Sequence, residues 1–514
     1  RLVELSKQHP KIPAIWNNLG NIYQNQNDWP NAITSYTRAL ALQPEHHSAR
    51  FNLALCLQKL GRAQEACQYL RPIIEQGLAD ENAWGLWVQA LRQLHQYSGA
   101  QSALDVALRR HPKSAHLWLQ QGALFEQQKR WQEALSAYQR AVPLQPELHL
   151  AWSQLAYLQA TNGEWTALAH TLGKLKQLVA EGSTDISPFV LLALTDDPEL
   201  HYRAARQWSQ RYAPYADTRP APSRRQHLTI AYLSADFYQH PTAFLAASLF
   251  EHHDRQRFRV LAYSNSPDDK SDMRKRLENA FDAFYDIRHW SVPEIVSHIQ
   301  SQQVDILIDL KGHTEDALLE VLAQRPAPLQ LTYLGYPGTT GAPFIDSVIA
   351  DSVVLPEQLT PHFSEHPIRL NHCYQVNDVK RPRPQTHMPR SVFGFRDEDV
   401  VLACFNNSWK ISKAMLECWL RILQAAPNTR LWLMDRNPSS RFQSNVRRAV
   451  RAHGLDESRV SFAMPRPYEE YLRYYLRVDL MLDTFPYNAH TMTSDALWMA
   501  CPVLTLEGRT FAAR

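Results

Sequence analysis

Histidine, hydroxyl and carboxylate side chains are crowded into the segment NAHTMTSDALW, residues 488–498, which follows an apolar run. The start of a helix presents unpaired N–H groups and the positive end of the helix dipole. His490, Thr491 and Thr493 stand between a predicted strand and a predicted helix that begins at Asp495, so they would form an anion site into which a diphosphate fits. The alternative is capping of the helix by Thr491 or Thr493, which needs no ligand.

A single cation follows a second apolar run. Asn407 and Lys410 come directly after VLACF, and Lys410 would supply a second neutralising charge for a diphosphate. The chain contains no GxGxxG motif after the first predicted strand and no GxxxxGK[ST] motif. These absences weigh against a nicotinamide dinucleotide site and exclude a P-loop NTPase.

Polar side chains also end the strands of an earlier set. Asp236 and His240 follow the first predicted strand, Lys311 and His313 follow DILIDL, and the motif GYPGTTG at 335–341 follows LTYL. Ligands of open α/β sheets bind outside the carboxyl ends of the strands. We therefore expect these groups to line a binding site.

Short β-rich runs alternate with helix-like runs through the last two thirds of the chain. Alternation of this kind predicts parallel sheets covered by helices. One set of strands begins near residue 228 and a second near residue 399, and the Pro-rich segments at 217–226 and 376–390 read as linkers. The pattern predicts two doubly wound domains that face each other across a cleft.

The first third of the chain is an internal repeat. Trp16, Gly20 and Tyr36 fit the tetratricopeptide signature, and shifts by 34 residues return the pattern until about residue 180. Such repeats stack into a solenoid with a concave face. Along that face the pattern predicts a column of mostly amide side chains that could bind a peptide backbone, or could be ordinary solvated positions: Asn18, Asn52, Leu86, Gln120 and Gln154.

Composition excludes several classes of protein. The 514 residues carry a net charge of +3 without a long basic run, so no nucleic-acid partner is indicated. The six cysteines are scattered without metal-ligand spacing, which argues against a zinc site and favours a reducing, cytoplasmic environment. No window of 18 apolar residues exists, so no membrane span is expected, and the first residues lack a signal-peptide pattern. Since the chain begins inside a repeat, we expect its start to be a truncation point.

Several ordered motifs together resemble the O-GlcNAc transferases of glycosyltransferase family 41. They are the repeats followed by SADFYQHPTAFL, AQRPAPLQLTYLGYPGTTGAPFIDSVIADSVVLP, FNNSWKISK and LMLDTFPYNAHTMTSDALWMACPVLTLEGRTFAAR. The resemblance covers nearly the whole chain. It implies a GT-B fold, UDP-N-acetylglucosamine as donor, protein Ser or Thr as acceptor, inversion at the anomeric carbon and no metal or other cofactor.

The resemblance also implies roles for individual residues. Lys410 would bind the diphosphate and stabilise the leaving group, Asp495 would accept hydrogen bonds from the ribose, and His490 would hold the phosphates with Thr491 and the helix start. His240 matches the proposed general base, and the ordinary pKa of histidine near 6.5 suits that task. As an alternative, His240 only caps a helix or contacts the donor, and His313 is the second candidate base.

The remaining expected contacts complete the site. Asn407, Tyr471 and Thr493 are expected on the donor side, and Pro337 and Gly338 on the acceptor side. We expect protein or peptide acceptors to lie in the repeat groove with Asn18 and Asn52. A homodimer is left open as the assembly state.

The chain departs from the animal members of the family at several positions. Tyr468, Tyr471 and Tyr474 stand where those enzymes carry Lys, His and Arg around the uridine, Asn407 replaces Gln, and Met492 replaces a second Thr. The long insertion between the catalytic halves is missing. These differences indicate a bacterial-type homologue. They leave open an O-fucosyltransferase that uses GDP-fucose, as in plant-type members, and a peptide-binding scaffold without activity.

The predicted organisation is therefore multidomain. We expect an all-α tetratricopeptide solenoid over 1–180, a helical linker over 181–226, and two α/β domains over 227–380 and 395–514. The first α/β domain would face the acceptor and the second the nucleotide sugar. The resemblance implies that the second continues past residue 514.

Overall fold

The computed structural model describes residues 2–26, 28–213, 215, 219–222, 225–385, 388–435 and 441–514. The chain forms two compact units, 1–151 and 152–514. The expected boundary near residue 180 lies inside the second unit. Parts of both predicted linkers, 216–218 and 223–224 in the first and 386–387 in the second, lie outside the described residues.

The first unit is all helical, as the repeat predicts. Its helices are α1 (Leu2–Gln8), α2 (Pro13–Asn25), α3 (Trp29–Leu42), α4 (His47–Lys59), α5 (Ala63–Glu75), α6 (Glu81–Gln93), α7 (Tyr97–Arg110), α8 (Ala115–Gln127) and α9 (Trp131–Leu144). The repeat has a physical basis at the close contact inside each helix pair. A Cβ atom at Gly20 would lie 2.5 Å from the ring of Tyr36, and one at Gly122 would lie 2.4 Å from the ring of Tyr138. Both tyrosines are fully buried, so only glycine leaves room for them.

The second unit begins with further helices. They are α10 (His149–Asn162), which spans the boundary between the units, α11 (Trp165–Ala180), α12 (Pro188–Leu192) and α13 (Pro198–Ser209), followed by the 3₁₀ turn η1 (Gln210–Tyr212). None of the helices in the described ranges is both long and apolar enough to cross a membrane.

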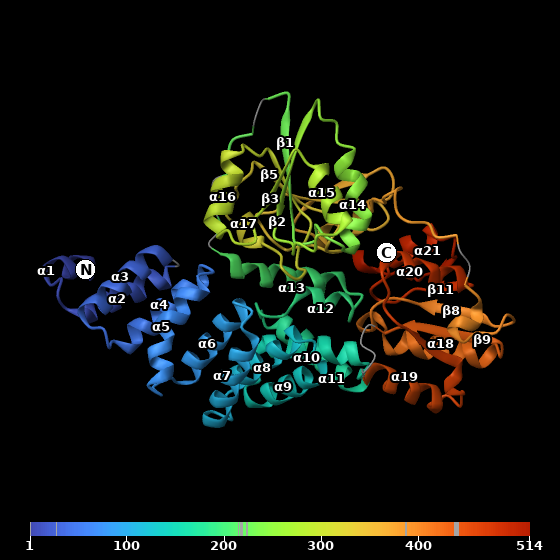
Figure 1. The fold of residues 1–514 in the computed structure, drawn as a ribbon, viewed down its shortest axis with the longest axis horizontal. Helices are drawn as coiled ribbons and strands as arrows, with labels where there is room; N and C mark the ends of the chain where they lie inside the picture. The colour runs from blue at the N-terminus through green and yellow to red at the C-terminus, as the bar shows by residue number, and fades with distance from the viewer. Residues whose placement is uncertain are drawn as a thin grey trace. The chain divides into compact units, whose positions relative to one another are not determined.

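A parallel sheet of seven strands follows, in the order β3-β2-β1-β4-β5-β6-β7. Its strands are β1 (Leu228–Ser234), β2 (Phe258–Ser264), β3 (Ala283–Asp286), β4 (Ile306–Asp309), β5 (Leu329–Thr332), β6 (Ser347–Asp351) and β7 (His366–Leu370). The helices are α14 (Pro241–Glu251), α15 (Asp272–Ala280), α16 (Val292–Ser301) and α17 (Leu319–Ala323), with η2 (Glu357–His362). Figure 1 shows α14 and α15 on one side of the strands and α16 and α17 on the other.

Alternate residues of β1 explain the two cores of this domain. Ile230 and Tyr232 pack with α14 and α15, whereas Ala231 and Leu233 pack with α16 and α17. Side chains of successive strand residues point to opposite faces of a sheet. The strand, which is apolar from residue 230 to residue 233, therefore lies buried between two layers of helices.

A second parallel sheet has the order β10-β9-β8-β11-β12. Its strands are β8 (Val400–Cys404), β9 (Thr429–Met434), β10 (Val460–Ala463), β11 (Leu480–Leu482) and β12 (Val503–Leu504). The helices are α18 (Lys413–Ala425), α19 (Arg441–Ala452), α20 (Tyr468–Leu472) and α21 (Thr491–Trp498), with the 3₁₀ turns η3 (Arg390–Phe393), η4 (Ser408–Lys410), η5 (Glu457–Arg459), η6 (Arg473–Arg477) and η7 (Phe511–Ala513). Again α18 and α19 cover one face and α20 and α21 the other (Figure 1). The expected pair of doubly wound sheets after a helical solenoid is confirmed.

Candidate functional site

Three charged or titratable groups meet at the carboxyl ends of β1 and β4. The Nζ atom of Lys311 lies 2.7 Å from Oδ1 of Asp236, and both side chains are buried. Nδ1 of His240 lies 3.5 Å from the other oxygen of the same carboxylate. Burial lowers the pKa of His240, and the Lys311 charge lowers it further, against the opposing effect of Asp236. The imidazole is therefore neutral at neutral pH.

His240 occupies the N-cap position of α14. Its Nδ1 accepts a hydrogen bond from the backbone N–H of Thr242 at 3.2 Å, which assigns the ring proton to Nε2. The capping alternative thus describes the geometry of the unliganded chain. To accept a proton at Nε2, the ring must adopt the tautomer that carries its proton on Nδ1, and the Asp236 carboxylate can then accept a hydrogen bond from that N–H.

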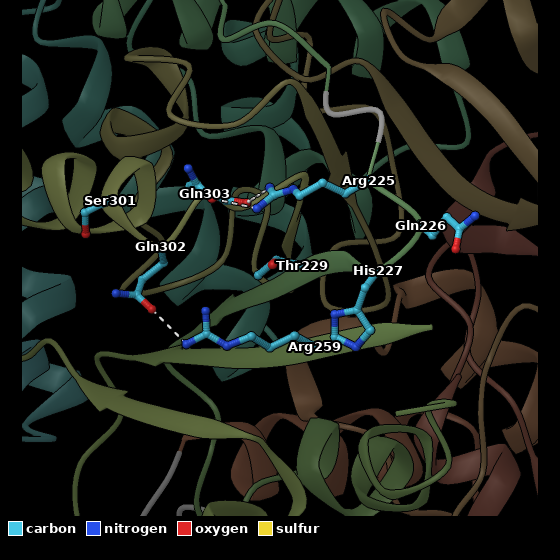
Figure 2. Close-up of a pocket in the computed structure, with 8 residues that line it drawn as sticks. All are labelled: Arg225, Gln226, His227, Thr229, Arg259, Ser301, Gln302 and Gln303. Carbon is cyan, nitrogen blue, oxygen red and sulfur yellow. Dashed lines mark hydrogen bonds between the residues drawn. The ribbon is translucent and has the colours of Figure 1, made fainter. Parts of the chain in front are cut away.

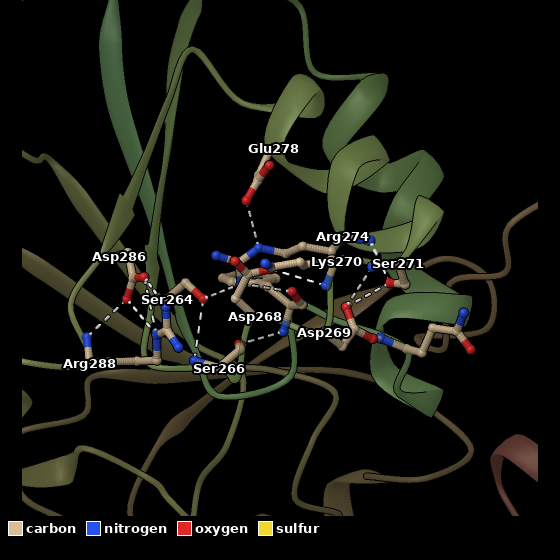
Figure 3. Close-up of polar contacts among 12 residues, drawn as sticks. Ser264, Ser266, Asp268, Asp269, Lys270, Ser271, Arg274, Glu278, Asp286 and Arg288 are labelled. Atoms are coloured by element: carbon tan, nitrogen blue, oxygen red, sulfur yellow. Dashed lines mark hydrogen bonds and ion pairs between the residues drawn. The ribbon is translucent and has the colours of Figure 1, made fainter.

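The end of β2, the loop after it and helix α15 hold the backbone that carries Asp236 and His240, and Figure 3 shows Ser264, Ser266 and Arg274 of these elements. Arg274 is buried, and its guanidinium donates to the carbonyl of Phe237 and to the hydroxyl of Ser264, each at 3.1 Å. Ser266 accepts from the backbone N–H of Phe237 at 2.7 Å. These bonds fix the backbone between Asp236 and His240.

His313 is buried beside the loop formed by GYPGTTG. Its Nε2 donates to the carbonyl of Thr340 at 2.6 Å, so its Nδ1 keeps a lone pair, and that atom has no hydrogen-bond partner among the described residues. Burial lowers the pKa of His313 to about 4, with the Arg211 charge acting in the same direction. The side chain is a neutral acceptor. Pro337 and Gly338, expected on the acceptor side, are buried in this loop, and their contact with an acceptor stays a prediction.

A buried carboxylate and helix α13 hold the same loop. Glu365 accepts from the hydroxyls of Thr339 and Thr340 and from the Thr340 backbone N–H. At Gly341, whose φ is +64°, a Cβ atom would lie 2.2 Å from the backbone nitrogen of Arg206. The final glycine of the motif therefore allows α13 to approach.

Lys410 lies at the carboxyl end of β8, as its position in the sequence predicts. Its Nζ donates to the carbonyl of Asn488 at 3.0 Å and lies 3.6 Å from the ring centroid of Tyr487. Burial lowers the pKa of Lys410 to about 7, although the Asp483 carboxyl and the Cys404 thiol raise it. Asn407 immediately precedes this turn, and its carbonyl accepts from the Lys410 backbone N–H at 3.0 Å.

The helix α21 begins at Thr491 rather than at Asp495, which corrects the expected start. Thr491 and Thr493 lie inside its first turn, and His490 is the N-cap residue without a side-chain capping bond. Nε2 of His490 donates to the carbonyl of Ala512, and Nδ1 accepts from the hydroxyl of Tyr374, each at 3.2 Å. Burial lowers the pKa of His490 to about 3, with the Lys410 charge in the same direction. The helix start and Lys410 meet at this turn.

Asp495 lies buried in α21 and is held by two residues. Its Oδ1 accepts from the hydroxyl of Tyr468 at 2.7 Å and from the guanidinium of Arg381 at 3.2 Å. Burial raises the pKa of Asp495 to about 6, although these two bonds lower it. The ring of Tyr468 stacks on Phe244 of α14, with centroids 4.1 Å apart. Sequence reasoning missed Arg381, which belongs to no motif, and Phe244, which lies in SADFYQHPTAFL but is apolar, because they meet Asp495 and Tyr468 only through the fold.

Tyr471, which was predicted to contact the nucleobase of the donor, is buried in a group of aromatic side chains. Its hydroxyl contacts Tyr475 and the Sδ atom of Met492. Its ring lies 6.4 Å from that of Tyr468 at an angle of 27°. Stacking of Tyr471 on a base stays a prediction.

The two predicted groups of site residues are linked through one apolar cluster. Tyr336, next to His313 with ring centroids 5.2 Å apart, belongs to the same buried cluster as Tyr487, above which Lys410 lies. A hollow of about 640 Å³ lies elsewhere, at the amino-terminal ends of β1 and β2 beside Thr229 and Arg259 (Figure 2). That end of the sheet is opposite to the candidate site.

Some side chains of the predicted amide column of the solenoid already form hydrogen bonds within the protein. Asn18 is exposed, Asn52 donates to Asn21 at 3.1 Å, and Gln120 accepts from Arg92 at 2.7 Å. Leu86 is buried and interrupts the column, as expected. Binding of a peptide by this face stays a prediction.

Comparison with known proteins identifies the two parts of the chain. A family described as glycosyl transferase family 41 matches residues 209–388 and 380–514, and tetratricopeptide repeats match residues 7–77 and 86–149. The chain is 33% identical over 347 residues to the probable UDP-N-acetylglucosamine--peptide N-acetylglucosaminyltransferase SEC of Arabidopsis thaliana, which covers 64% of this chain and 35% of that protein. It is 31% identical over 328 residues to the SPINDLY protein of Oryza sativa subsp. japonica, described by the same enzyme name, over 60% of this chain and 34% of that protein.

A solved structure shares the fold. A mutant of the O-GlcNAc transferase of Thermobaculum terrenum superposes with a TM-score of 0.63 at 24% identity, and the match covers 98% of this chain and 84% of that chain. The chain spans about a third of the length of the curated relatives it matches.

Proposed function

Because the chain belongs to glycosyl transferase family 41, we propose that it transfers N-acetylglucosamine from UDP-N-acetylglucosamine to the hydroxyl group of Ser or Thr side chains in proteins. The observation that carries this proposal is the position of Lys410, buried beside the start of α21. An ammonium group and unpaired helix N–H groups together suit a diphosphate.

The donor site in this proposal follows α21. The diphosphate lies at the Thr491 and Thr493 end of the helix with Lys410 and His490 beside it. The ribose hydroxyls bind the carboxylate of Asp495, whose Oδ1 atom is held by Tyr468 and Arg381.

The chemical step is a single displacement with inversion. The acceptor oxygen forms a bond to the anomeric carbon while the bond from that carbon to the phosphate oxygen breaks, and UDP leaves with the electron pair. Negative charge develops on the diphosphate, where Lys410 stands, and fixed positive charge at such a point lowers the barrier. This account of the leaving group requires no metal ion.

The acceptor proton goes to a histidine. His240 is our first candidate, since Asp236 can accept a hydrogen bond from Nδ1–H in the tautomer that leaves Nε2 free to take the acceptor proton. His313 is the second, and its neutral Nδ1 supports that role. Replacing each by asparagine separates the two, because the true base loses turnover with UDP affinity unchanged.

Protein acceptors fit the repeats. The curated relatives are named as peptide transferases, and a tetratricopeptide solenoid offers an extended concave face for a peptide. We place Asn18 and Asn52 on that face. Pro337 and Gly338 would border the acceptor where it meets the sugar.

The test is intact-mass analysis of Ser- and Thr-containing peptides after incubation with UDP-N-acetylglucosamine or GDP-fucose in EDTA. The proposal expects addition of one N-acetylhexosamine, loss of that product in Lys410→Ala, and full activity in Lys413→Ala. Lys413 is the matched control because it is an exposed lysine three residues away. Addition of deoxyhexose from GDP-fucose would support the fucosyl alternative, which the tyrosines at 468, 471 and 474 keep open.

A further inference from the structure

The turn that carries Lys410 is held by the helices that follow the solenoid repeats. The hydroxyl of Ser408 donates to the carbonyl of Thr161 at 2.8 Å. The indole N–H of Trp165 donates to the carbonyl of Ile411 at 2.9 Å. Both ends of the turn η4 are therefore bonded to α10 and α11.

Trp409, which lies between Ser408 and Ile411, also contacts these helices. The ring of Trp409 lies 5.2 Å from that of Phe189 in α12 and 6.1 Å from that of Tyr157 in α10. On its other side Trp409 lies 5.3 Å from Tyr487, whose ring is under the Lys410 ammonium. An unbroken array of aromatic rings thus runs from the helices to the lysine.

From these contacts we propose that Phe189, Tyr157 and Trp409 are positioning residues for Lys410, so that helices α10 and α12 form part of the donor site. The inference rests on the proposed function, in which Lys410 binds the diphosphate. It assigns to this helical segment a role in binding the nucleotide sugar in addition to any role in holding the acceptor.

The physical reason is the burial of the ammonium. Lys410 is buried, and burial is the main cause of its lowered pKa. The titratable groups that face it are the carboxyl of Asp483, the thiol of Cys404, the neutral ring of His490 and the phenol of Tyr487, and none of them belongs to α12. Removal of an aromatic ring behind Trp409 lets the turn relax and admits water, which returns the lysine pKa towards its ordinary value of about 10.4.

The experiment compares Phe189→Ala and the milder Phe189→Leu with Tyr69→Ala in the full chain. Tyr69 is a half-buried aromatic residue of α5 in the first unit and serves as the matched control. UDP affinity is measured by calorimetry between pH 6.5 and 9. For Phe189→Ala we expect a loss of about tenfold at pH 6.5, where the lysine is mostly cationic in both proteins and only its position differs, and a shift of the alkaline midpoint of the pH profile to higher pH, with Phe189→Leu between it and the wild type.

A second readout does not depend on the nucleotide. A soluble amine-reactive reagent acylates Lys410 only when the lysine is neutral. The pH dependence of this acylation, followed by peptide mass spectrometry, reports the pKa of Lys410 in the protein without nucleotide. We expect a midpoint near neutrality in the wild type and in Tyr69→Ala, and a higher midpoint in Phe189→Ala. A folded Phe189→Ala protein with the wild-type midpoint and the wild-type UDP affinity would overturn the inference. If the wild type fails to bind UDP, the proposed function fails, and the acylation midpoints still decide whether these helices position the lysine.

Discussion

The pKa values of Lys410 and Asp495 lie close together, with that of the lysine slightly above that of the aspartate. Burial lowers the pKa of the lysine to about 7 and raises that of the aspartate to about 6. The lysine is cationic below its pKa, and the carboxylate is anionic above its pKa. Between about pH 6 and pH 7 both groups are therefore mostly in the charged form that UDP binding needs.

We predict a bell-shaped pH profile for UDP affinity, with a maximum between about pH 6 and 7. Above it, affinity falls because Lys410 is neutral in the free protein. Below it, affinity falls because Asp495 is protonated, while protonation of UDP itself contributes near pH 6. Calorimetry over this range tests the profile. An affinity that stays constant from pH 7 to pH 9 would contradict the assignment of Lys410.

The loss of UDP affinity above pH 7 can be tested by measuring the protons that are taken up when UDP binds. If the diphosphate restores the charge of Lys410, then binding at pH 8.5 takes up close to one proton per UDP. Calorimetry in buffers of different ionisation enthalpy measures this number. In Lys410→Ala the uptake should vanish, while in Lys413→Ala it should remain.

Asp495 allows a matched test with the nucleotide. Asp495→Asn should weaken UDP binding by about tenfold, since hydrogen bonds to a charged group contribute about 1.5–3 kcal/mol. The same substitution should change the affinity for 2′,3′-dideoxy-UDP little, because that ligand lacks the hydroxyls. Equal losses for both nucleotides would show that Asp495 acts on the structure and not on the ribose.

At the scale of elements, alanine substitution tests whether the glycines of the repeats are needed to make room for the buried tyrosine rings. Gly122→Ala should destabilise the first unit by about 1–3 kcal/mol, because a Cβ atom would overlap the buried ring of Tyr138. Gly85→Ala in α6 is the control, since no atom lies within 4 Å of its added Cβ. Alanine there should stabilise the helix by about 0.5–1 kcal/mol. Urea unfolding followed by circular dichroism distinguishes the two, and similar effects would refute the packing explanation.

The predictable elements were those with an uninterrupted local pattern. The apolar runs DILIDL and VLACF were predicted as strands, and the observed strands β4 and β8 overlap them. The short strand β3 begins at Ala283, close after the end of α15 at Ala280, and its four residues have no apolar alternation that would predict it. The edge strand β7 was missed because its five residues include Pro367, which is unfavourable within a strand.

Site residues that directly follow a strand could be predicted from the sequence, whereas contacts between distant segments could not. His240, His313 and Lys410 were placed from their positions after apolar runs, and the structure finds them at those ends. The bonds from Arg381 and Tyr468 to Asp495 join segments about a hundred and about thirty residues apart, respectively. Such contacts depend on how the two sheets meet, which a local pattern does not encode.

At the scale of the whole molecule, the two compact units should respond differently to the nucleotide. A ligand that binds only the folded second unit stabilises that unit by mass action. We predict that UDP slows hydrogen exchange in the segments 406–411 and 488–495 and in α10 and α12, and leaves exchange in helices α1 to α9 unchanged. Exchange measured by mass spectrometry with and without UDP tests this. Protection confined to α1 to α9 would contradict both the donor site and its link to the helices.

The central claim is that Lys410 and the start of α21 form the diphosphate site of a nucleotide-sugar donor. Calorimetric titration of UDP and GDP in EDTA, into the wild type and into Lys410→Ala and Lys413→Ala, tests it most directly. The account predicts that UDP binds the wild type and Lys413→Ala with similar affinity, that Lys410→Ala loses about ten- to a hundredfold, and that GDP binds more weakly than UDP. Equal UDP affinity in all three proteins, or no binding of either nucleotide to the folded wild type, would contradict it.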